Sequence, residues 1–264
     1  MTGSSGGAAQ AGEKRRPIGR DAKIVVVMPA LNAAGTLAET VSGIPSEWVD
    51  EMILVDDKSS DATVELARAL SVRVVWHPHT VGYGGNQKAC YLEALQRGAD
   101  AVVMLHPDGQ YEPEIIPKML TPILEGRADM VLGSRFAEPG AARASGMPLY
   151  KYVANRALTS IENVVLGASF TELHTGYRAY SRKLLLTVPF LRNSIDFSFD
   201  SEMLMQASQF GFRIVEVSAR TRYFEGASSV GPWTSTVYGV KTLWAAFRLL
   251  LHRSHLLPSR KYSR

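Results

Sequence analysis

The sequence is poor in features that mark several common protein classes. Among its 264 residues there is one cysteine, Cys90, so no disulfide can form within the chain. A reducing, cytoplasmic setting is therefore the default expectation. No uninterrupted apolar run reaches about 18 residues, which argues against a membrane-spanning helix. Residues 1–20 have no apolar core of the kind that a signal peptide needs, and we expect a disordered leader there.

Several ligand-binding motifs are also missing. The turn at 29–35 lacks G-x-G-x-x-G, which argues against a standard dinucleotide-binding fold. The glycine-rich segment 82–86 lacks the spacing of a P-loop, and the histidines lack the H-E-x-x-H spacing of a zinc protease. No nucleic-acid-binding motif is visible, so nucleic acid is not an expected partner.

What the sequence does have is a hydrophobic content of 46% and a formal net charge of +4. Many of the cations gather towards the two ends of the chain, where they include Lys14, Arg15, Arg16, Arg20, Arg248, Arg253, Arg260, Lys261 and Arg264. This distribution favours anionic partners such as nucleotide phosphates, a lipid phosphate or an anionic membrane surface.

Strand-like runs alternate with helical segments along the first half of the chain. The expected strands are 23–28, 51–55, 72–76, 101–105 and 130–132, and the expected helices are 36–42, 62–70, 87–97 and 114–125. This alternation predicts right-handed βαβ units and an α/β fold with a mainly parallel sheet flanked by helices. The second half adds helices at 149–166 and 200–210 and a strand at 213–217. We expect one main domain over 21–232 and an amphipathic, basic tail over 233–264.

Carboxylates follow two of the expected strands at the point where each strand ends. Asp56 and Asp57 end the second strand, and Asp108 lies in the loop that follows the fourth. Ligands of open α/β sheets bind at this carboxyl edge. Three carboxylates brought together there repel one another unless a positive group compensates them, and a divalent metal ion or the donors of a nucleotide would do so. Turn formation and helix capping are the alternative interpretation.

Glycine-rich and positive positions supply candidate anion-binding groups. Gly85 and Lys88 precede and begin an expected helix, where backbone N–H groups meet anions. Arg135, Arg178 and Arg222 lie near the ends of expected elements, and guanidinium groups match phosphate oxygens bidentately. A flexible turn and surface ion pairs are the alternatives for these positions.

Together these segments resemble a known family. Family 2 glycosyltransferases of the GT-A fold show the same order of short motifs as P-A-L-N at 29–32, V-D-D-K-S-S-D at 55–61, the loop at Gly82, D-G-Q at 108–110 and G-S-R-F at 133–136. T-G-Y-R-A-Y at 175–180 and F-D-S-E at 199–202 are similar to the branch that uses dolichol phosphate or polyprenyl phosphate. The resemblance implies that residues 21–232 form a Rossmann-like GT-A catalytic domain.

The resemblance also implies a role for each matching position. Ala30 and Asn32, with Asp57, would line the base and ribose of the nucleotide. With the candidates found from the strand and helix ends, the expected nucleotide-sugar-binding set is Pro29, Ala30, Asn32, Asp56, Asp57, Gly85, Lys88, His106 and Arg222. Mg²⁺ or Mn²⁺ would be held by Asp108, Gln110 and His106 against the donor diphosphate, where a metal neutralises the leaving group. The expected catalytic set is Asp108, Glu172, Asp200 and Arg135, with Arg135 and Arg222 on the donor or acceptor phosphate.

Two positions depart from the family pattern. The family usually has Asp-x-Asp where this chain has His106-Pro107-Asp108. His106 would then ligate the metal, orient its shell, or leave catalysis independent of metal. The family often has Asp ahead of the Tyr177-Arg178 pair, where this chain has Glu172. Either Glu172 or Asp200 would serve as general base for a hydroxyl acceptor, whereas an anionic lipid phosphate needs less help from a base.

The expected function is the inverting transfer of a sugar from a UDP- or GDP-sugar to a polyprenyl or dolichyl phosphate at the inner face of a membrane. A soluble natural-product or glycan acceptor is one alternative, and a nucleotide-sugar-binding protein without activity is another. The segment 237–251 suits an interfacial helix for peripheral membrane contact. Packing on the domain, or in the interface of a homo-oligomer, is the other interpretation of that segment.

Overall fold

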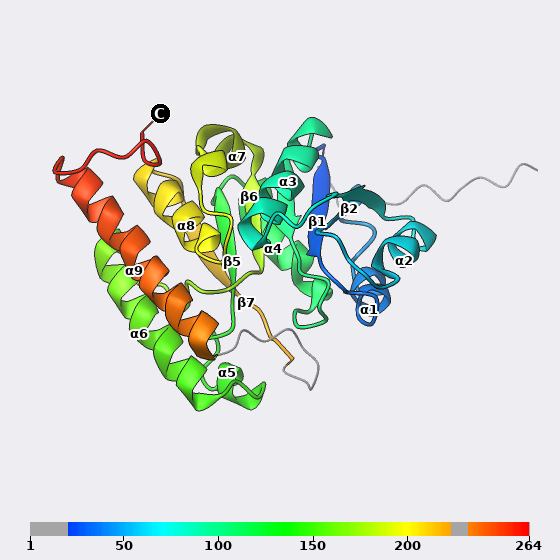
Figure 1. Ribbon diagram of the computed structural model, residues 1–264, viewed down its shortest axis with the longest axis horizontal. Coiled ribbons are helices and arrows are strands. Elements are labelled where there is room, and N and C mark those ends of the chain that lie inside the picture. The colour runs from blue at the N-terminus through cyan, green and yellow to red at the C-terminus, as the bar shows by residue number, and fades with distance from the viewer. Residues whose placement is uncertain (1–20, 223–231, 264) are drawn as a thin grey trace, which may run out of the picture.

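The computed structural model describes residues 21–222 and 232–263, so the expected leader at 1–20 lies outside the described residues. A seven-stranded sheet with the order β3-β2-β1-β4-β6-β5-β7 forms the centre (Figure 1). Its strands are β1 Ile24–Ala30, β2 Glu51–Asp56, β3 Arg73–Trp76, β4 Ala101–Met104, β5 Met130–Ser134, β6 Arg178–Ser181 and β7 Ile214–Ser218. Neighbouring strands are parallel except at β6, which is antiparallel to β4 and β5. The predicted α/β fold with a mainly parallel sheet is confirmed.

Helices cover both faces of this sheet. They are α1 Leu37–Ser42, α2 Thr63–Ala69, α3 Tyr83–Gln96, α4 Ile116–Leu124, α5 Ala141–Ala144, α6 Leu149–Leu166, α7 Arg182–Thr187, α8 Phe199–Gln209 and α9 Pro232–Arg253, with 3₁₀ turns η1 Pro113–Ile115 and η2 Phe190–Arg192. Successive residues of β1 alternate between two cores, one shared with α1, α2 and α4 and the other with α3, α7 and α8. All seven residues of β1 are buried, as expected for a strand covered on both faces.

The glycine-rich segment 82–86 is not the loop that its composition predicts, because α3 already begins at Tyr83. A Cβ on Gly84 would lie 2.5 Å from the Ser194 carbonyl oxygen and 2.8 Å from the Phe199 Cβ. The glycine therefore allows the first turn of α3 to approach the segment before α8. Close packing, rather than an unusual backbone conformation, therefore explains why residue 84 is a glycine.

β6 is a strand that the sequence pattern does not predict. It has four residues, and it begins with Arg178, whose side chain is fully buried. The guanidinium donates to the carbonyl oxygens of Leu173, Thr175 and Asp200 at 3.1, 2.8 and 2.7 Å. These hydrogen bonds stabilise the buried charge of Arg178. A hydropathy pattern does not show them, so it does not predict a strand that begins with an arginine.

The C-terminal helix α9 lies beside α6 and α8 (Figure 1). Ala246 and Leu249 are buried in this packing, whereas Val240, Trp244 and Phe247 remain exposed. The predicted amphipathic C-terminal helix is therefore present, and one of its faces packs on the domain. Within 21–222 and 232–263, no helix combines the length and the apolar character needed to cross a bilayer.

Candidate active site

Two buried carboxylates lie where β2 ends. The Asp57 carboxylate accepts hydrogen bonds from the backbone N–H groups of Val81 and Gly82, at 2.7 and 3.1 Å. Asp56 accepts from the backbone N–H of Ser59 at 2.9 Å and from the hydroxyl of the same residue. Both carboxylates are thus compensated by hydrogen-bond donors and fix the two loops beside them.

The end of β1 is tied to the same edge. Asn32 has a positive φ of 54°, a conformation that asparagine tolerates well. Its side-chain oxygen accepts from the backbone N–H of Ser60 at 2.8 Å, and the Ala30 carbonyl accepts from the N–H of Asp57 at 2.8 Å. Pro29 and Ala30 are the last residues of β1. The structure therefore brings Pro29, Ala30, Asn32, Asp56 and Asp57 together, as the sequence predicts.

Asp108 lies in the loop after β4, at the same sheet edge. One carboxylate oxygen accepts from the N–H of Gln110 at 3.0 Å, and the Thr36 hydroxyl fixes the loop by donating to the Pro107 carbonyl at 2.6 Å. Burial raises the pKa of the Asp108 carboxyl, while the nearby His106 opposes the shift. A raised pKa shows that the charged form is incompletely compensated, and a cation would correct this.

His106 belongs to a chain of polar contacts that runs from the Asp108 loop to α8. Its Nε2 lies 3.3 Å from the hydroxyl of Tyr83, and the two rings stack with centroids 5.5 Å apart. The Tyr83 hydroxyl donates to Asp200 at 2.7 Å, and Asp200 lies 3.9 Å from the guanidinium of Arg178. Tyr83 was absent from the predicted site. Its place within the G-Y-G-G-N segment, directly after a glycine, is the only sequence signal for it.

Arg135 and Glu172 form a buried ion pair after β5. The guanidinium and the backbone N–H of Arg135 both donate to the carboxylate, and Asn155 adds a third donor at 2.8 Å. Burial alone would raise the pKa of Glu172, but Arg135 outweighs it and the pKa lies below its usual value. Glu172 is fully buried. The geometry makes it an anchor for Arg135 and gives it no access to an acceptor hydroxyl.

Three other predicted binding residues are placed differently. The Lys88 ammonium donates to the Asn193 carbonyl, and burial lowers its pKa. Gly85 lies inside α3, where a Cβ would meet that of Val81 at 3.0 Å. Arg222 is exposed and its side chain lies 3.4 Å from Glu39, although its backbone N–H donates to the Gln110 carbonyl at 2.9 Å. The structure thus brings the Arg222 backbone, but not the Lys88 ammonium, to the Asp108 loop.

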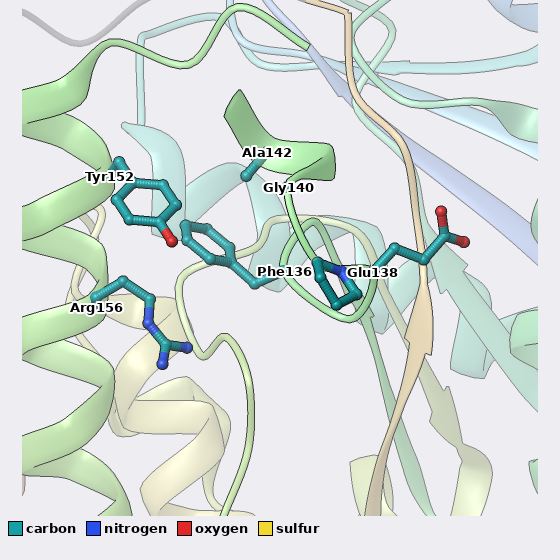
Figure 2. A pocket seen from close by; sticks show the side chains of 7 residues that line it. Phe136, Glu138, Gly140, Ala142, Tyr152 and Arg156 are labelled. Atoms are coloured by element: carbon teal, nitrogen blue, oxygen red, sulfur yellow. The ribbon is translucent and has the colours of Figure 1, made fainter. Parts of the chain in front are cut away.

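A pocket of about 200 Å³ lies beside the loop that follows Arg135. It is lined by Phe136, Glu138, Pro139, Gly140, Ala142, Tyr152 and Arg156. The rings of Phe136 and Tyr152 are 5.1 Å apart, and the Arg156 guanidinium lies 5.9 Å from the Phe136 ring centroid (Figure 2). The pocket therefore combines aromatic walls with the exposed guanidinium of Arg156.

Comparison with known proteins agrees with this geometry. The profile of Glycosyl transferase family 2 matches residues 25–188, which contain all of β1 except its first residue, β2 to β6 and both edge carboxylate groups. The chain belongs to Glycosyl transferase family 2. It is therefore a glycosyltransferase, as the sequence motifs predict.

Two relatives of this family 2 glycosyltransferase act on lipid phosphates by name. The UDP-N-acetylglucosamine–dolichyl-phosphate N-acetylglucosaminyltransferase of Methanococcus voltae is 28% identical, over 88% of this chain and 96% of the relative. The undecaprenyl-phosphate mannosyltransferase of Micrococcus luteus is 29% identical, over 74% of this chain and 82% of the relative. The resemblance to the polyprenyl-phosphate branch is thereby confirmed.

A solved structure shares the fold of this glycosyltransferase. Glucosyl-3-phosphoglycerate synthase from Mycobacterium tuberculosis, in complex with phosphoglyceric acid, superposes with a TM-score of 0.68. The identity is 22%, and the match covers 87% of this chain and 80% of the synthase. The same synthase has been solved with Mn²⁺, UDP-glucose and phosphoglyceric acid, with a TM-score of 0.63 to this chain. At this identity the likeness shows the GT-A fold.

Proposed function

We propose that the chain transfers a sugar from a nucleotide-sugar to the phosphate of a polyprenyl or dolichyl lipid. One observation carries the proposal: groups of opposite charge line a single edge of the sheet. Asp57 and Asp108 follow β2 and β4, and Arg135 follows β5, which runs in the same direction. A donor with a sugar and a diphosphate, and an acceptor with a phosphate, would meet complementary groups there.

The donor half of the proposed site is the edge formed by β1, β2 and β4. The ends of β1 and β2 offer backbone groups and the Asn32 amide for a nucleoside, in a cradle stabilised by Asp56 and Asp57. Because these groups are held in fixed positions, they would bind the nucleoside in one orientation. UDP- and GDP-sugars are both candidates, because none of the hydrogen bonds on this edge selects one base.

A divalent cation, Mg²⁺ or Mn²⁺, fits the donor half on the chemistry of its ligands. Among the described residues no three His, Cys, Asp or Glu side chains cluster as a metal cage. Asp108 and His106 would supply the protein ligands, with Gln110 beside them, and the donor diphosphate would supply the rest, as is usual for Mg²⁺. Such a cation would neutralise the charge that develops on the departing nucleoside diphosphate.

The acceptor half is the region after β5. Arg135, held by Glu172, offers a guanidinium for an acceptor phosphate. Lys151 on α6 lies close enough that the Arg135 charge adds to burial in lowering the pKa of Lys151. In the transfer, the sugar C1–O bond to the diphosphate breaks with its electron pair on the leaving oxygen, and an acceptor phosphate oxygen forms the new bond. That oxygen is already anionic, so no general base is required and Asp200 need not serve as one.

The exposed faces of α6 and α9 are the proposed membrane-facing surface. Val240, Trp244 and Phe247 recur at the spacing of one helical face and are 63%, 53% and 48% exposed. Val153 and Val164 are exposed on the neighbouring α6. Aromatic side chains beside a basic tail suit peripheral attachment to an anionic lipid surface at the cytoplasmic face. In this proposal, residues 21–232 carry the catalysis, and residues 233–264, together with the exposed face of α6, carry the attachment.

A soluble acceptor that carries a phosphate is the second candidate, favoured by the fold shared with glucosyl-3-phosphoglycerate synthase. A donor screen separates the candidates. The full chain is incubated with UDP- and GDP-sugars, with and without Mn²⁺, and with either polyprenyl phosphate in vesicles or 3-phosphoglycerate. We expect a metal-dependent glycosyl phospholipid.

Other outcomes of the screen have defined meanings. Product on 3-phosphoglycerate alone would favour the soluble acceptor. A donor that raises Tm without yielding product on any acceptor would indicate a nucleotide-sugar-binding protein. Vesicle-independent dimers that bury α9 would assign its exposed face to self-association.

A further inference from the structure

Tyr83 has no part in the chemistry proposed above, yet it connects two residues of the site. It opens α3, and its hydroxyl lies 2.7 Å from Asp200 Oδ2 and 3.3 Å from His106 Nε2. Its ring is stacked on His106 with an interplanar angle of 13°, and Phe197 packs at 4.5 Å between centroids. The hydroxyl is therefore held in place between the imidazole and the carboxylate.

The direction of these hydrogen bonds follows from the number of protons. A tyrosine hydroxyl has one proton, and an ionised carboxylate only accepts. Asp200 also accepts from the Gln87 amide at 3.3 Å and lies 3.9 Å from the Arg178 guanidinium, with which it forms an ion pair. Burial, and then the Asp200 charge, raise the pKa of Tyr83 well above its usual value, so the hydroxyl keeps its proton. The Tyr83 oxygen consequently accepts from His106, which makes Nε2 the N–H donor.

The Nε2 edge of the His106 ring is enclosed. A Cβ on Gly176 would lie 2.9 Å from Nε2 and 3.0 Å from Cδ2, so this edge packs against the glycine. Among residues 21–222 and 232–263, none forms a hydrogen bond with Nδ1. In a neutral imidazole with its proton on Nε2, the lone pair is on Nδ1.

We propose that Tyr83 is a positioning residue that, backed by Asp200, fixes the Nε2–H tautomer of His106 and presents Nδ1 as the electron-pair donor beside Asp108. The inference rests on the proposed function, because the group that would use this lone pair is the cation shared with a donor diphosphate. It gives His106 a defined role at the position where the family pattern has an aspartate. Tyr83 and Asp200 select one ring nitrogen, as outer partners of metal-ligating histidines commonly do.

The tautomer is tested without metal or turnover. Long-range ¹H–¹⁵N spectra of the ¹⁵N-labelled full chain are recorded at about pH 8.5, two units above the ordinary histidine pKa. His106→Gln identifies the resonance. In the wild type we expect an unprotonated Nδ1 and a protonated Nε2, and in Tyr83→Phe a mixture of both tautomers. Tyr262→Phe is the matched control, because its buried hydroxyl donates to the Ala245 carbonyl away from the site and should leave His106 unchanged.

Mn²⁺ binding in the presence of UDP is the second measurement. Tyr83→Phe should weaken it by about tenfold, the lower end of the effect of losing an outer partner of a metal ligand. A wild-type ring protonated on Nδ1, or a Tyr83→Phe variant with unchanged tautomer or unchanged Mn²⁺ affinity, would overturn the inference. Absence of transfer to every acceptor by the wild type would instead overturn the proposed function, and the spectra would still decide the role of Tyr83.

Discussion

The two halves of the candidate site compensate their buried carboxylates in opposite ways. At the edge of β1, β2 and β4, Asp56 and Asp57 are compensated by backbone N–H groups and by the Ser59 hydroxyl. After β5, Glu172 is paired with the guanidinium of Arg135. Donors from the backbone leave the net negative charge in place, whereas a guanidinium cancels it. The first half therefore retains negative potential for a cation, whereas the second half holds a guanidinium in a fixed position with its charge balanced by Glu172.

This difference predicts that substitutions in the first half remove activity, and that substitutions in the second half first remove stability. Asp108→Ala is expected to have the largest effect. Losing the carboxylate that would hold the cation should lower kcat/KM by about a thousandfold or more, since metal ions supply several kcal/mol to such transition states. Steady-state kinetics with the donor identified in the screen would measure it.

The control for Asp108→Ala is Asp100→Ala. Asp100 directly precedes the same strand at the opposite edge of the sheet, where it accepts from the backbone N–H of Lys23 at 2.8 Å. It should retain the wild-type rate. Equal losses in both variants would show that Asp108 acts through folding, and the contrast between the two halves would fail.

Glu172→Gln tests the second half. The change leaves the Arg135 charge buried without its partner, which typically costs about 3–5 kcal/mol. Thermal unfolding should show Tm lowered by roughly 10 °C. Glu125→Gln removes an exposed partner of Arg127 and should leave Tm unchanged.

The same pair predicts how stability depends on pH. The folded pKa of Glu172 lies below the ordinary value of 4.5, so its stabilisation is complete above pH 4.5 and is lost as the pH falls through the folded pKa. The gap in unfolding free energy between wild type and Glu172→Gln should therefore shrink in acid. A gap that is constant from pH 7 to strongly acidic conditions would show that the pair is not an ion pair in solution.

Much of the first half could be predicted from the sequence, because the relevant residues are contiguous with strand ends. A parallel strand delivers whatever follows it to the carboxyl edge, so Asn32, Asp57 and Asp108 needed no tertiary information. The role of Glu172 could not be predicted. A glutamate beside Tyr177 and Arg178 suggests a base, and only the fold shows that it is fully buried against Arg135. Tyr83 was missed because α3 begins inside a glycine-rich segment that composition assigns to a loop.

The exposed face of α9 lies outside the candidate site, and we expect substitutions there to weaken membrane binding by a smaller factor than Asp108→Ala lowers activity. Trp244→Ser removes a side chain that is 53% exposed, and vesicle sedimentation with anionic lipid should show about tenfold weaker binding, as expected for losing one large apolar anchor. Trp76→Ser is matched in chemistry and exposure, at 57%, but lies on β3 at the far edge of the sheet. If both variants lose the same affinity, α9 is not the attachment surface.

The smallest expected effect is a rise in Tm, for Asp108→Asn. Because Glu172→Gln should lower Tm, this variant tests the difference between the two halves most directly. Asp108 is a carboxylate whose pKa is raised by burial, so its charge costs stability while no cation is present. Asp108→Asn removes that charge and should raise the Tm of the metal-free protein by about 2–4 °C, the shift that corresponds to roughly 1 kcal/mol in a chain of this size. With Mn²⁺ and UDP added, the wild type should gain stability and the variant should not. Replacing a carboxylate by an amide would then stabilise the metal-free protein at Asp108, in the first half of the site, and destabilise it at Glu172, in the second. A lower Tm for metal-free Asp108→Asn would mean that Asp108, like Glu172, is a structural anchor.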